Sequence, residues 1–311
     1  MAQALIADPG APLVGPAVVE QIERADAFLL NLECCISTRG TPFPDPRKPF
    51  FFRAPPVAAE RLAQLRVDAV TLANNHALDF GPDALLDTLE HLSAVGITAV
   101  GAGANEALAR TPAYLSCGEL RVRIVALSDH PAAYAATRDG PGVAFADLRR
   151  ELPDWAAVAA RPGPDADLVL VTPHWGPNMV AEPTAPVRRA AEALRAAGAT
   201  LIAGHSAHVF QGVRPGVLFD LGDFLDDYAV DRELRNDLGL LWLVELDATG
   251  MRGLRALPLA LDYCFTRVAS PAERDWIVDR LRALCAPFGT QVQSADGMIE
   301  IELRNAFTPG A

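Results

Sequence analysis

The sequence is poor in positive charge and in long apolar stretches. It has a single lysine, Lys48, and its 39 acidic residues outnumber its 27 basic ones, which leaves a net charge of −12. Nucleic-acid binding needs a basic surface that neutralises phosphates, so this balance argues against it, and it also disfavours tight binding to an anionic membrane. No apolar stretch reaches the ~20 residues that span a bilayer. No basic segment followed by an apolar block indicates a signal peptide, so we expect a cytoplasmic protein.

Cysteine is scarce, and two familiar catalytic motifs are incomplete. The five cysteines are odd in number and show no metal-binding spacing, which is typical of small core residues in a reducing compartment. Residues 101–103 lack the third glycine of a dinucleotide-binding loop. Residues 204–208 fail the nucleophile elbow of serine hydrolases at its last position. A dinucleotide-dependent enzyme and a serine hydrolase are therefore disfavoured.

What the chain does contain is enough apolar sequence, 50% of 311 residues, for a large core. Strand-like and helix-like segments alternate, which predicts an α/β fold. Helices are expected at 55–66, 82–95, 186–197 and 271–285, the last with a capping box at its start. Strands are expected at 27–30, 69–73, 97–100, 121–127, 168–172, 201–203, 217–221, 240–246 and 254–259, with an edge strand at 299–303. No linker or repeat interrupts them, so we expect one domain over 1–311, in which 247–311 is a C-terminal extension.

Four of the six histidines come just after predicted strands. These histidines, each with its strand, are His76 after 69–73, His174 after 168–172, and His205 and His208 after 201–203. A further apolar run, 27–30, leads to Glu33. Loops beyond the carboxyl ends of strands carry the active site in open α/β sheets, so we expect these side chains at one rim.

Carboxylate, amide and imidazole groups gathered at one rim form the ligand set of a metal site. Metal-dependent hydrolases leave one position open for water, which loses a proton near neutral pH and becomes the nucleophile. The candidate ligands are Glu33, Asn75, His174, His205 and His208. Mn, Fe and Zn all accept such ligands. The sequence therefore predicts a site for one or two divalent ions, of Mn, Fe or Zn.

Five motifs occur in a characteristic order along the chain. They are Asn31-Leu32-Glu33, residues 72–81 (LANNHALDFG), His174-Trp175-Gly176, residues 204–209 (GHSAHV) and residues 221–224 (LGDF). Together they resemble the capsule synthesis protein CapA family, also called the poly-γ-glutamate biosynthesis family, within the calcineurin-like metallophosphoesterase superfamily. The resemblance covers about residues 1–246. It implies an α/β fold in which a two-sheet β-sandwich is flanked by helices (αββα).

The resemblance also implies roles for the candidate ligands. Glu33 would bridge two ions. Asn75, His174 and His205 would bind one ion, and His208 would bind the other.

The motif at 72–81 further implies a catalytic pair. His76 would face the substrate and donate a proton to the leaving group or stabilise developing negative charge. Asp79 would either orient His76 or cap the helix that begins at Pro82, and both alternatives stay open.

Two charged segments have two interpretations each. Residues 45–53 place three cations around three aromatic residues, and they either bind an anionic substrate or form a solvated loop with buried Phe residues. Four aspartates follow a predicted strand and either support the metal site or form a solvated acidic loop: Asp223, Asp226, Asp227 and Asp231.

One departure from the superfamily concerns the start of the chain. Members open with a strand ending in Gly-Asp, and that Asp binds the first metal, whereas this chain begins Met1-Ala2-Gln3-Ala4. We expect the upstream reading frame to encode such a strand. Without it, the ion beside His208 keeps only Glu33 as a further ligand, and apolar sheet edges are exposed. An in-frame stop codon directly before Met1 would contradict this expectation.

Three functions agree with these features. The first is a metal-dependent hydrolase of a phosphoester or amide that uses a metal-bound hydroxide on an anionic small molecule or polymer, such as a γ-glutamyl chain. The second is a non-hydrolytic accessory protein in the synthesis or export of a capsule or poly-γ-glutamate polymer. The third is a non-catalytic member that keeps the fold as a binding module. Metal content and turnover distinguish the three.

Overall fold

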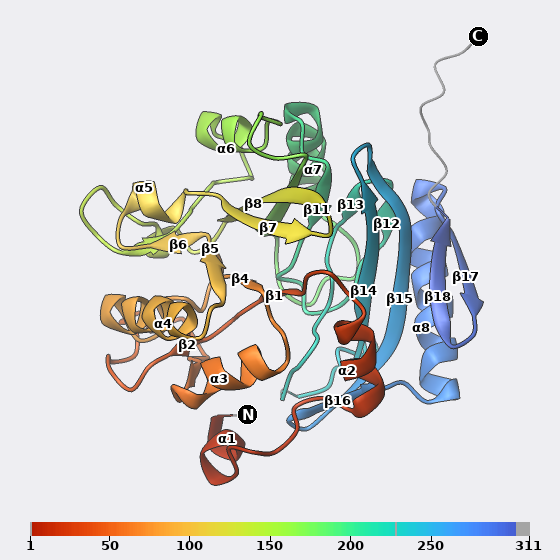
Figure 1. Ribbon diagram of the computed structural model, residues 1–311, viewed down its shortest axis with the longest axis horizontal. Coiled ribbons are helices and arrows are strands. Elements are labelled where there is room, and N and C mark those ends of the chain that lie inside the picture. The colour runs from red at the N-terminus through yellow and green to blue at the C-terminus, as the bar shows by residue number, and fades with distance from the viewer. Residues whose placement is uncertain (1, 228, 303–311) are drawn as a thin grey trace.

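The computed structural model, drawn in Figure 1, describes residues 2–227 and 229–302. The helices are α1 (Ala2–Ala7), α2 (Pro16–Glu23), α3 (Val57–Gln64), α4 (Pro82–Ala94), α5 (Glu106–Ala109), α6 (Asp154–Ala159), α7 (Ala185–Ala197) and α8 (Pro271–Cys285), with 3-10 turns η1 (Ala132–Tyr134) and η2 (Ala286–Phe288). The strands are β1 (Leu29–Asn31), β2 (Cys35–Ile36), β3 (Arg53–Ala54), β4 (Ala69–Thr71), β5 (Thr98–Val100), β6 (Ala102–Gly103), β7 (Ala113–Cys117), β8 (Leu120–Ser128), β9 (Gly142–Val143), β10 (Leu168–His174), β11 (Leu201–Ala203), β12 (Val213–Arg214), β13 (Val217–Leu218), β14 (Leu238–Asp247), β15 (Gly250–Asp262), β16 (Phe265–Val268), β17 (Gln291–Ala295) and β18 (Met298–Glu302). Within the described ranges, no helix has both the length and the apolar character needed to cross a bilayer.

Two sheets pack face to face at the centre of the molecule. One is parallel, with the order β1-β4-β5, and the other has the order β12-β13-β11-β10-β8-β7. Successive side chains of a strand point to opposite faces. In β4 and β8, Ala69 and Ile124 therefore lie in the cluster between the sheets, whereas Val70 and Val125 point outward.

Helices cover the outer face of each sheet. Ala59 of α3 and Leu85 of α4 share a buried cluster with Val70 on the outside of the three-stranded sheet. Leu194 of α7 packs in the same way with Val169 on the outside of the six-stranded sheet. Figure 1 shows the resulting layers. The predicted α/β class, with two sheets flanked by helices, is confirmed.

The C-terminal elements add a third sheet, β14-β15-β18-β17, on which α8 packs. Leu201 and Leu218 of the six-stranded sheet belong to the same buried cluster as α8. The interpretation of 299–303 as an edge strand is wrong in its placement. Residues 298–302 form β18 between β15 and β17, and Leu303 lies outside the described residues. The sequence did not indicate β17, the strand that pairs with the outer side of β18. Because β17 buries only Val292, it shows little alternation of apolar and polar residues.

The predicted capping box at the start of α8 is confirmed. The Ser270 hydroxyl accepts a hydrogen bond from the Glu273 N–H, and the Glu273 carboxylate accepts one from the Ser270 N–H at 2.7 Å. Arg267 also donates to both carboxylate oxygens of Glu273, at 2.8 and 3.0 Å. These contacts, of which the hydrogen bonds from Arg267 have the largest effect, hold the pKa of Glu273 at about 2 despite its partial burial.

Replacing Glu273 by glutamine is expected to lower the free energy of unfolding at pH 7 by about 1–2 kcal/mol. Because the folded pKa is below the unfolded value, this contribution is present above pH 4.5 and is lost as the pH falls toward 2. Urea unfolding at pH 7 and at lower pH measures it. Asp279→Asn, at an exposed carboxylate of the same helix, is the control. A loss that stays constant down to low pH would contradict the assignment.

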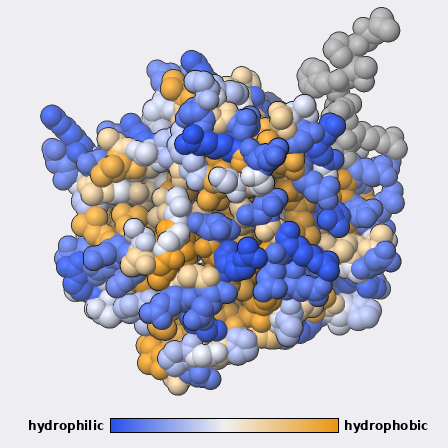
Figure 2. Space-filling view, viewed as in Figure 1, coloured by the Kyte–Doolittle hydropathy of each residue, from blue (hydrophilic) through white to orange (hydrophobic). Residues whose placement is uncertain are grey.

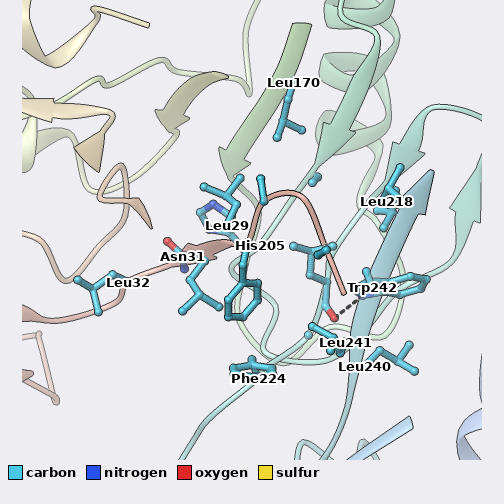
Figure 3. Close-up of a pocket in the computed structure, with 18 of the residues that line it drawn as sticks. Leu29, Asn31, Leu32, Leu170, His205, Leu218, Phe224, Leu240, Leu241 and Trp242 are labelled. Atoms are coloured by element: carbon cyan, nitrogen blue, oxygen red, sulfur yellow. Dashed lines mark hydrogen bonds between the residues drawn. The ribbon is translucent and has the colours of Figure 1, made fainter. Parts of the chain in front are cut away.

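Two sheet edges face a common cleft. In the described chain, β1 pairs only with β4, and β14 only with β15. A cleft of about 930 Å³ separates β1 from β14, and it is lined by residues of both and of β10. Figure 3 shows Leu170, Leu241 and Trp242 around it. On the face seen in Figure 2, hydrophobic residues reach the surface between hydrophilic ones. Each of these two strands thus has one edge without a strand partner in the described part of the chain.

Candidate metal centre

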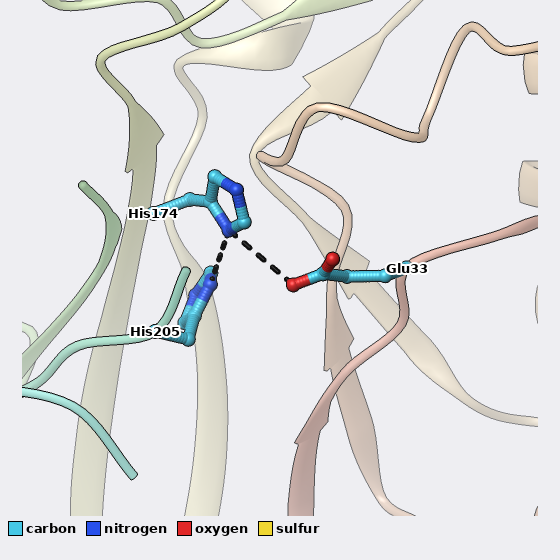
Figure 4. A group of neighbouring side chains, drawn as sticks. All are labelled: Glu33, His174 and His205. Carbon is cyan, nitrogen blue, oxygen red and sulfur yellow. Dashed lines mark hydrogen bonds and ion pairs between the residues drawn. The ribbon is translucent and has the colours of Figure 1, made fainter. Parts of the chain in front are cut away.

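Three of the predicted ligands meet where neighbouring strands end. His174 is the last residue of β10, His205 follows the adjacent parallel strand β11, and Glu33 follows β1. Figure 4 shows the three side chains converging. His174 Nδ1 lies 2.8 Å from His205 Nδ1 and 3.5 Å from Glu33 Oε1. One candidate ligand atom from each residue lies within 4.8 Å of the others, as one metal ion requires.

The site also contains buried polar atoms without hydrogen-bond partners. Among the described residues these include Glu33 Oε2, His174 Nε2 and Asp223 Oδ2, and Asn75 Oδ1, in the loop after β4, is another such atom. Buried polar atoms are normally paired, so a cluster of exceptions calls for an explanation. Carboxylate oxygens and an amide oxygen offer lone pairs, and so does one ring nitrogen of a neutral imidazole; a cation satisfies them. The residues present therefore fit a divalent metal.

Burial keeps two of the imidazoles uncharged. It lowers the pKa of His174 well below the usual value and, together with the charges of His208 and His130, lowers the pKa of His205 to about 3. Both are therefore neutral at pH 7, which is the form that binds metal, and no proton must be displaced when an ion binds.

His208 is held differently, by Asp223. Its Nδ1 lies 3.0 Å from Asp223 Oδ1, and its Nε2 lies 4.0 Å from Glu33 Oε2. Burial opposes the imidazolium charge, but Asp223 outweighs it and raises the pKa of His208 to about 10. Of the four aspartates considered from the sequence, Asp223 thus contacts a candidate ligand. Asp231 instead accepts hydrogen bonds from the N–H groups of the 233–234 turn.

Second contacts hold the ligands in place. Asn31 Nδ2 donates to Glu33 Oε1 at 2.5 Å, and Asn74 Nδ2 donates to Asn31 Oδ1 at 3.0 Å, which ties the ends of β1 and β4 together. His205 Nε2 lies 3.1 Å from Thr172 Oγ1 on β10. Such partners fix the orientation of a metal-binding side chain.

The predicted catalytic pair is also in contact. His76 Nδ1 lies 2.7 Å from Asp79 Oδ2, and the ring of Phe52 packs on the imidazole with centroids 4.1 Å apart. Helix α4 begins after Gly81 and has no side-chain cap. Of the two alternatives for Asp79, the contact with His76 is present and the helix cap is not.

Residues 45–53 correspond to neither of their two interpretations in full. The Lys48 side chain points inward to Asp79, at 3.0 Å. Phe50 is 53% exposed, whereas Phe51 and Phe52 are half-buried. Arg47 is exposed and pairs with Asp45.

The sequence prediction missed His130. Its ring centroid lies 5.0 Å from that of His174, and its Nδ1 contacts Asp129. Asp129 also accepts a hydrogen bond from the Gly176 N–H at 3.0 Å. Residues 129–130 directly follow β8, so the rule of strand ends that located the other histidines could have located this one.

The fold and this site define an α/β protein with a candidate metal centre at the rim of its sheets. Residues 8–228 match the model of the family described as bacterial capsule synthesis protein PGA_cap, and the chain belongs to this family. The predicted membership in the capsule synthesis family is thereby confirmed.

Curated relatives agree with this membership. A protein of Mycobacterium tuberculosis named "Probable polyglutamine synthesis accessory protein" is 35% identical over 309 residues, which cover 92% of this chain and 79% of the relative. The PGA biosynthesis protein CapA of Bacillus subtilis is 28% identical, over 53% of this chain and 44% of its own length. The capsule biosynthesis protein CapA of Bacillus anthracis is 31% identical, over 51% and 40%.

Solved structures resemble the chain more distantly. A hypothetical protein from Thermus thermophilus matches with a TM-score of 0.39 at 17% identity, covering 81% of this chain and 88% of the other. A phosphatase from Mycoplasma pneumoniae matches with a TM-score of 0.37 at 15% identity, covering 70% and 89%.

Proposed function

We propose that this chain is a divalent-metal-dependent hydrolase that cleaves a phosphoester or an amide bond in capsule or poly-γ-glutamate synthesis. The observation that carries the proposal is the convergence of Glu33, His174 and His205 within 4.8 Å, with buried lone pairs that no described donor satisfies. A purely structural cluster of buried polar groups would be expected to pair them internally.

We propose the ligand set that the family resemblance implies, and the convergence of Glu33, His174 and His205 supports it. Glu33, Asn75, His174 and His205 would hold one ion of Mn, Fe or Zn. Glu33 and His208, whose facing atoms are 4.0 Å apart, would contribute to a second ion, and His208 would have to lose its proton when that ion binds. When bound, a divalent ion supplies Lewis acidity and lowers the pKa of water.

Proton transfer is the role of His76 and Asp79. Asp79 accepts from Nδ1 of His76, which leaves Nε2 as the atom that faces a substrate and donates a proton to the leaving group. The packed Phe52 ring limits the rotation of the imidazole. We propose an anionic substrate, either a phosphoester or a γ-glutamyl chain.

Metal content and turnover test the proposal. Purified wild-type protein is expected to contain close to stoichiometric Mn, Fe or Zn by elemental mass spectrometry and to hydrolyse bis(p-nitrophenyl) phosphate or γ-glutamyl peptides. His174→Ala is expected to lose both metal and turnover, because it removes a ligand. His91→Ala, on α4, is the matched control and should retain both.

The accessory role is the second candidate, and the name of the mycobacterial relative favours it. Tight metal binding without turnover on phosphoesters or γ-glutamyl peptides would support it over the hydrolase. Protein that binds no metal would instead favour the third function, a non-catalytic binding module.

A further inference from the structure

Lys48, the only lysine of the chain, lies partly buried beside the candidate site. Its side chain is 14% exposed, and its ammonium lies 3.0 Å from Asp79 Oδ1. The same ammonium donates to the backbone carbonyl of Asn75 at 2.8 Å. It also lies 5.8 and 5.6 Å from the ring centroids of Phe51 and Tyr134. A strongly hydrated cation is costly to bury, so these contacts must compensate for its lost hydration.

The carboxylate that Lys48 meets divides its two oxygens between different tasks. The Asp79 side chain is fully buried. Its Oδ1 forms an ion pair with Lys48 at 3.0 Å and accepts a hydrogen bond from the Tyr134 hydroxyl, also at 3.0 Å. Its Oδ2 faces His76 Nδ1 and accepts from the Phe52 N–H at 2.6 Å. One face of Asp79 thus binds the lysine, while the other orients the imidazole.

Lys48 also contacts Asn75, a predicted metal ligand. Asn75 Oδ1 is one of the buried atoms without a partner, and Lys48 binds the main-chain carbonyl of the same residue. A single ammonium therefore connects Asn75, the proposed amide ligand, with the carboxylate that contacts His76.

We propose that Lys48 is a positioning residue that sets the metal-facing amide of Asn75 and the substrate-facing imidazole of His76 together. The inference rests on the proposed function, since it concerns the same site. Within residues 45–53, Lys48 would thus act through Asp79 and Asn75 rather than by binding the substrate.

The competing role for Lys48 is charge balance for Asp79 alone. Tyr134 separates the two roles, because it binds the same oxygen of Asp79 but has no described bond to Asn75. If Lys48 acts only through Asp79, Lys48→Met and Tyr134→Phe should leave the metal affinity equally intact. If Lys48 also positions Asn75, only Lys48→Met should weaken metal binding.

The experiment compares Mn²⁺ affinity, turnover of bis(p-nitrophenyl) phosphate at saturating Mn²⁺, and Tm. For Lys48→Met we expect the Kd for Mn²⁺ to rise about tenfold and kcat to fall on the order of 10–100-fold, the range typical of residues that orient metal ligands. KM should change by less than about threefold, since no substrate contact is lost. For Tyr134→Phe the Kd should stay within about twofold of wild type.

Two further variants keep the test decisive. Arg47→Met removes a cation from the same segment at an 89% exposed position and should match wild type in Kd and kcat. If Lys48→Met does not fold, Lys48→Arg keeps the charge for Asp79 but replaces the compact ammonium with a wider planar group. It should then fold and still bind Mn²⁺ about tenfold more weakly.

The outcomes distinguish this inference from the proposed function. Equal Mn²⁺ affinity in wild type, Lys48→Met and Lys48→Arg overturns the positioning role alone. Wild-type protein that binds Mn²⁺ without turnover overturns the hydrolase, while the Kd comparison still decides the role of Lys48. Wild-type protein that binds no Mn²⁺ overturns both.

Discussion

Replacing Glu33 by glutamine is expected to lower the affinity for Mn²⁺ by more than about 100-fold, because changes to residues that merely orient a ligand already cost 10–100-fold. Glu33 supplies the only carboxylate in the group of three that converges at the site. The metal-free protein should remain folded, since glutamine has nearly the same shape. Glu33 Oε2 also has no hydrogen-bond partner to lose.

Thermal unfolding with and without Mn²⁺ measures this effect. At a Mn²⁺ concentration of 100 times its Kd, wild type should gain about 2.7 kcal/mol of stability, whereas Glu33→Gln should gain almost none at the same concentration. Glu60→Gln, at an exposed glutamate of α3, controls for the loss of one negative charge. An undiminished Mn²⁺-induced shift in Glu33→Gln would falsify the assignment of Glu33 as a ligand.

A short apolar strand fused ahead of Met1 is expected to close the cleft between β1 and β14, because each of these strands has one unpaired edge in the described chain. One strand in the cleft would pair with both open edges and cover Leu170 and Leu241. Each apolar side chain that it buries contributes about 1.5–3 kcal/mol, so Tm should rise by on the order of 5 °C.

Binding of the hydrophobic dye ANS gives a second measure, because it reports exposed apolar surface. The chain of residues 1–311 should bind the dye in its native state, and the extended chain should lose most of that signal. An extension of equal length with its apolar residues replaced by serine is the control. Equal gains in Tm from both extensions would contradict the prediction.

The sequence predicted those site residues that both have side chains able to bind a metal and directly follow a strand. Glu33, His174 and His205 each follow an apolar strand, and parallel strands deliver such residues to one rim. The same reasoning applies to His130, which was missed although it follows β8. Lys48 was misinterpreted because an isolated cation in a loop gives no indication of whether it faces solvent or a buried carboxylate.

The fold was predictable where the signals are local. Helix α8 begins at its capping box because Ser270 and Glu273 bond to each other's backbone within one turn. The position of β18 was not predictable, since strand order depends on partners elsewhere in the chain. Its neighbour β17 is largely exposed and carries too few buried residues for a clear alternating pattern.

The amino-acid sequence by itself determined the α/β class, the family and the residues that converge on the candidate metal centre, because these follow from periodicity, motif order and the ends of parallel strands. Only the tertiary structure decided the charge state of each group. Burial lowers the pKa of His205 to about 3, whereas Asp223 raises that of His208 to about 10. The tertiary structure also places the Lys48 ammonium against Asp79. Burial and charge partners come from segments far apart in the chain, so no local pattern encodes them.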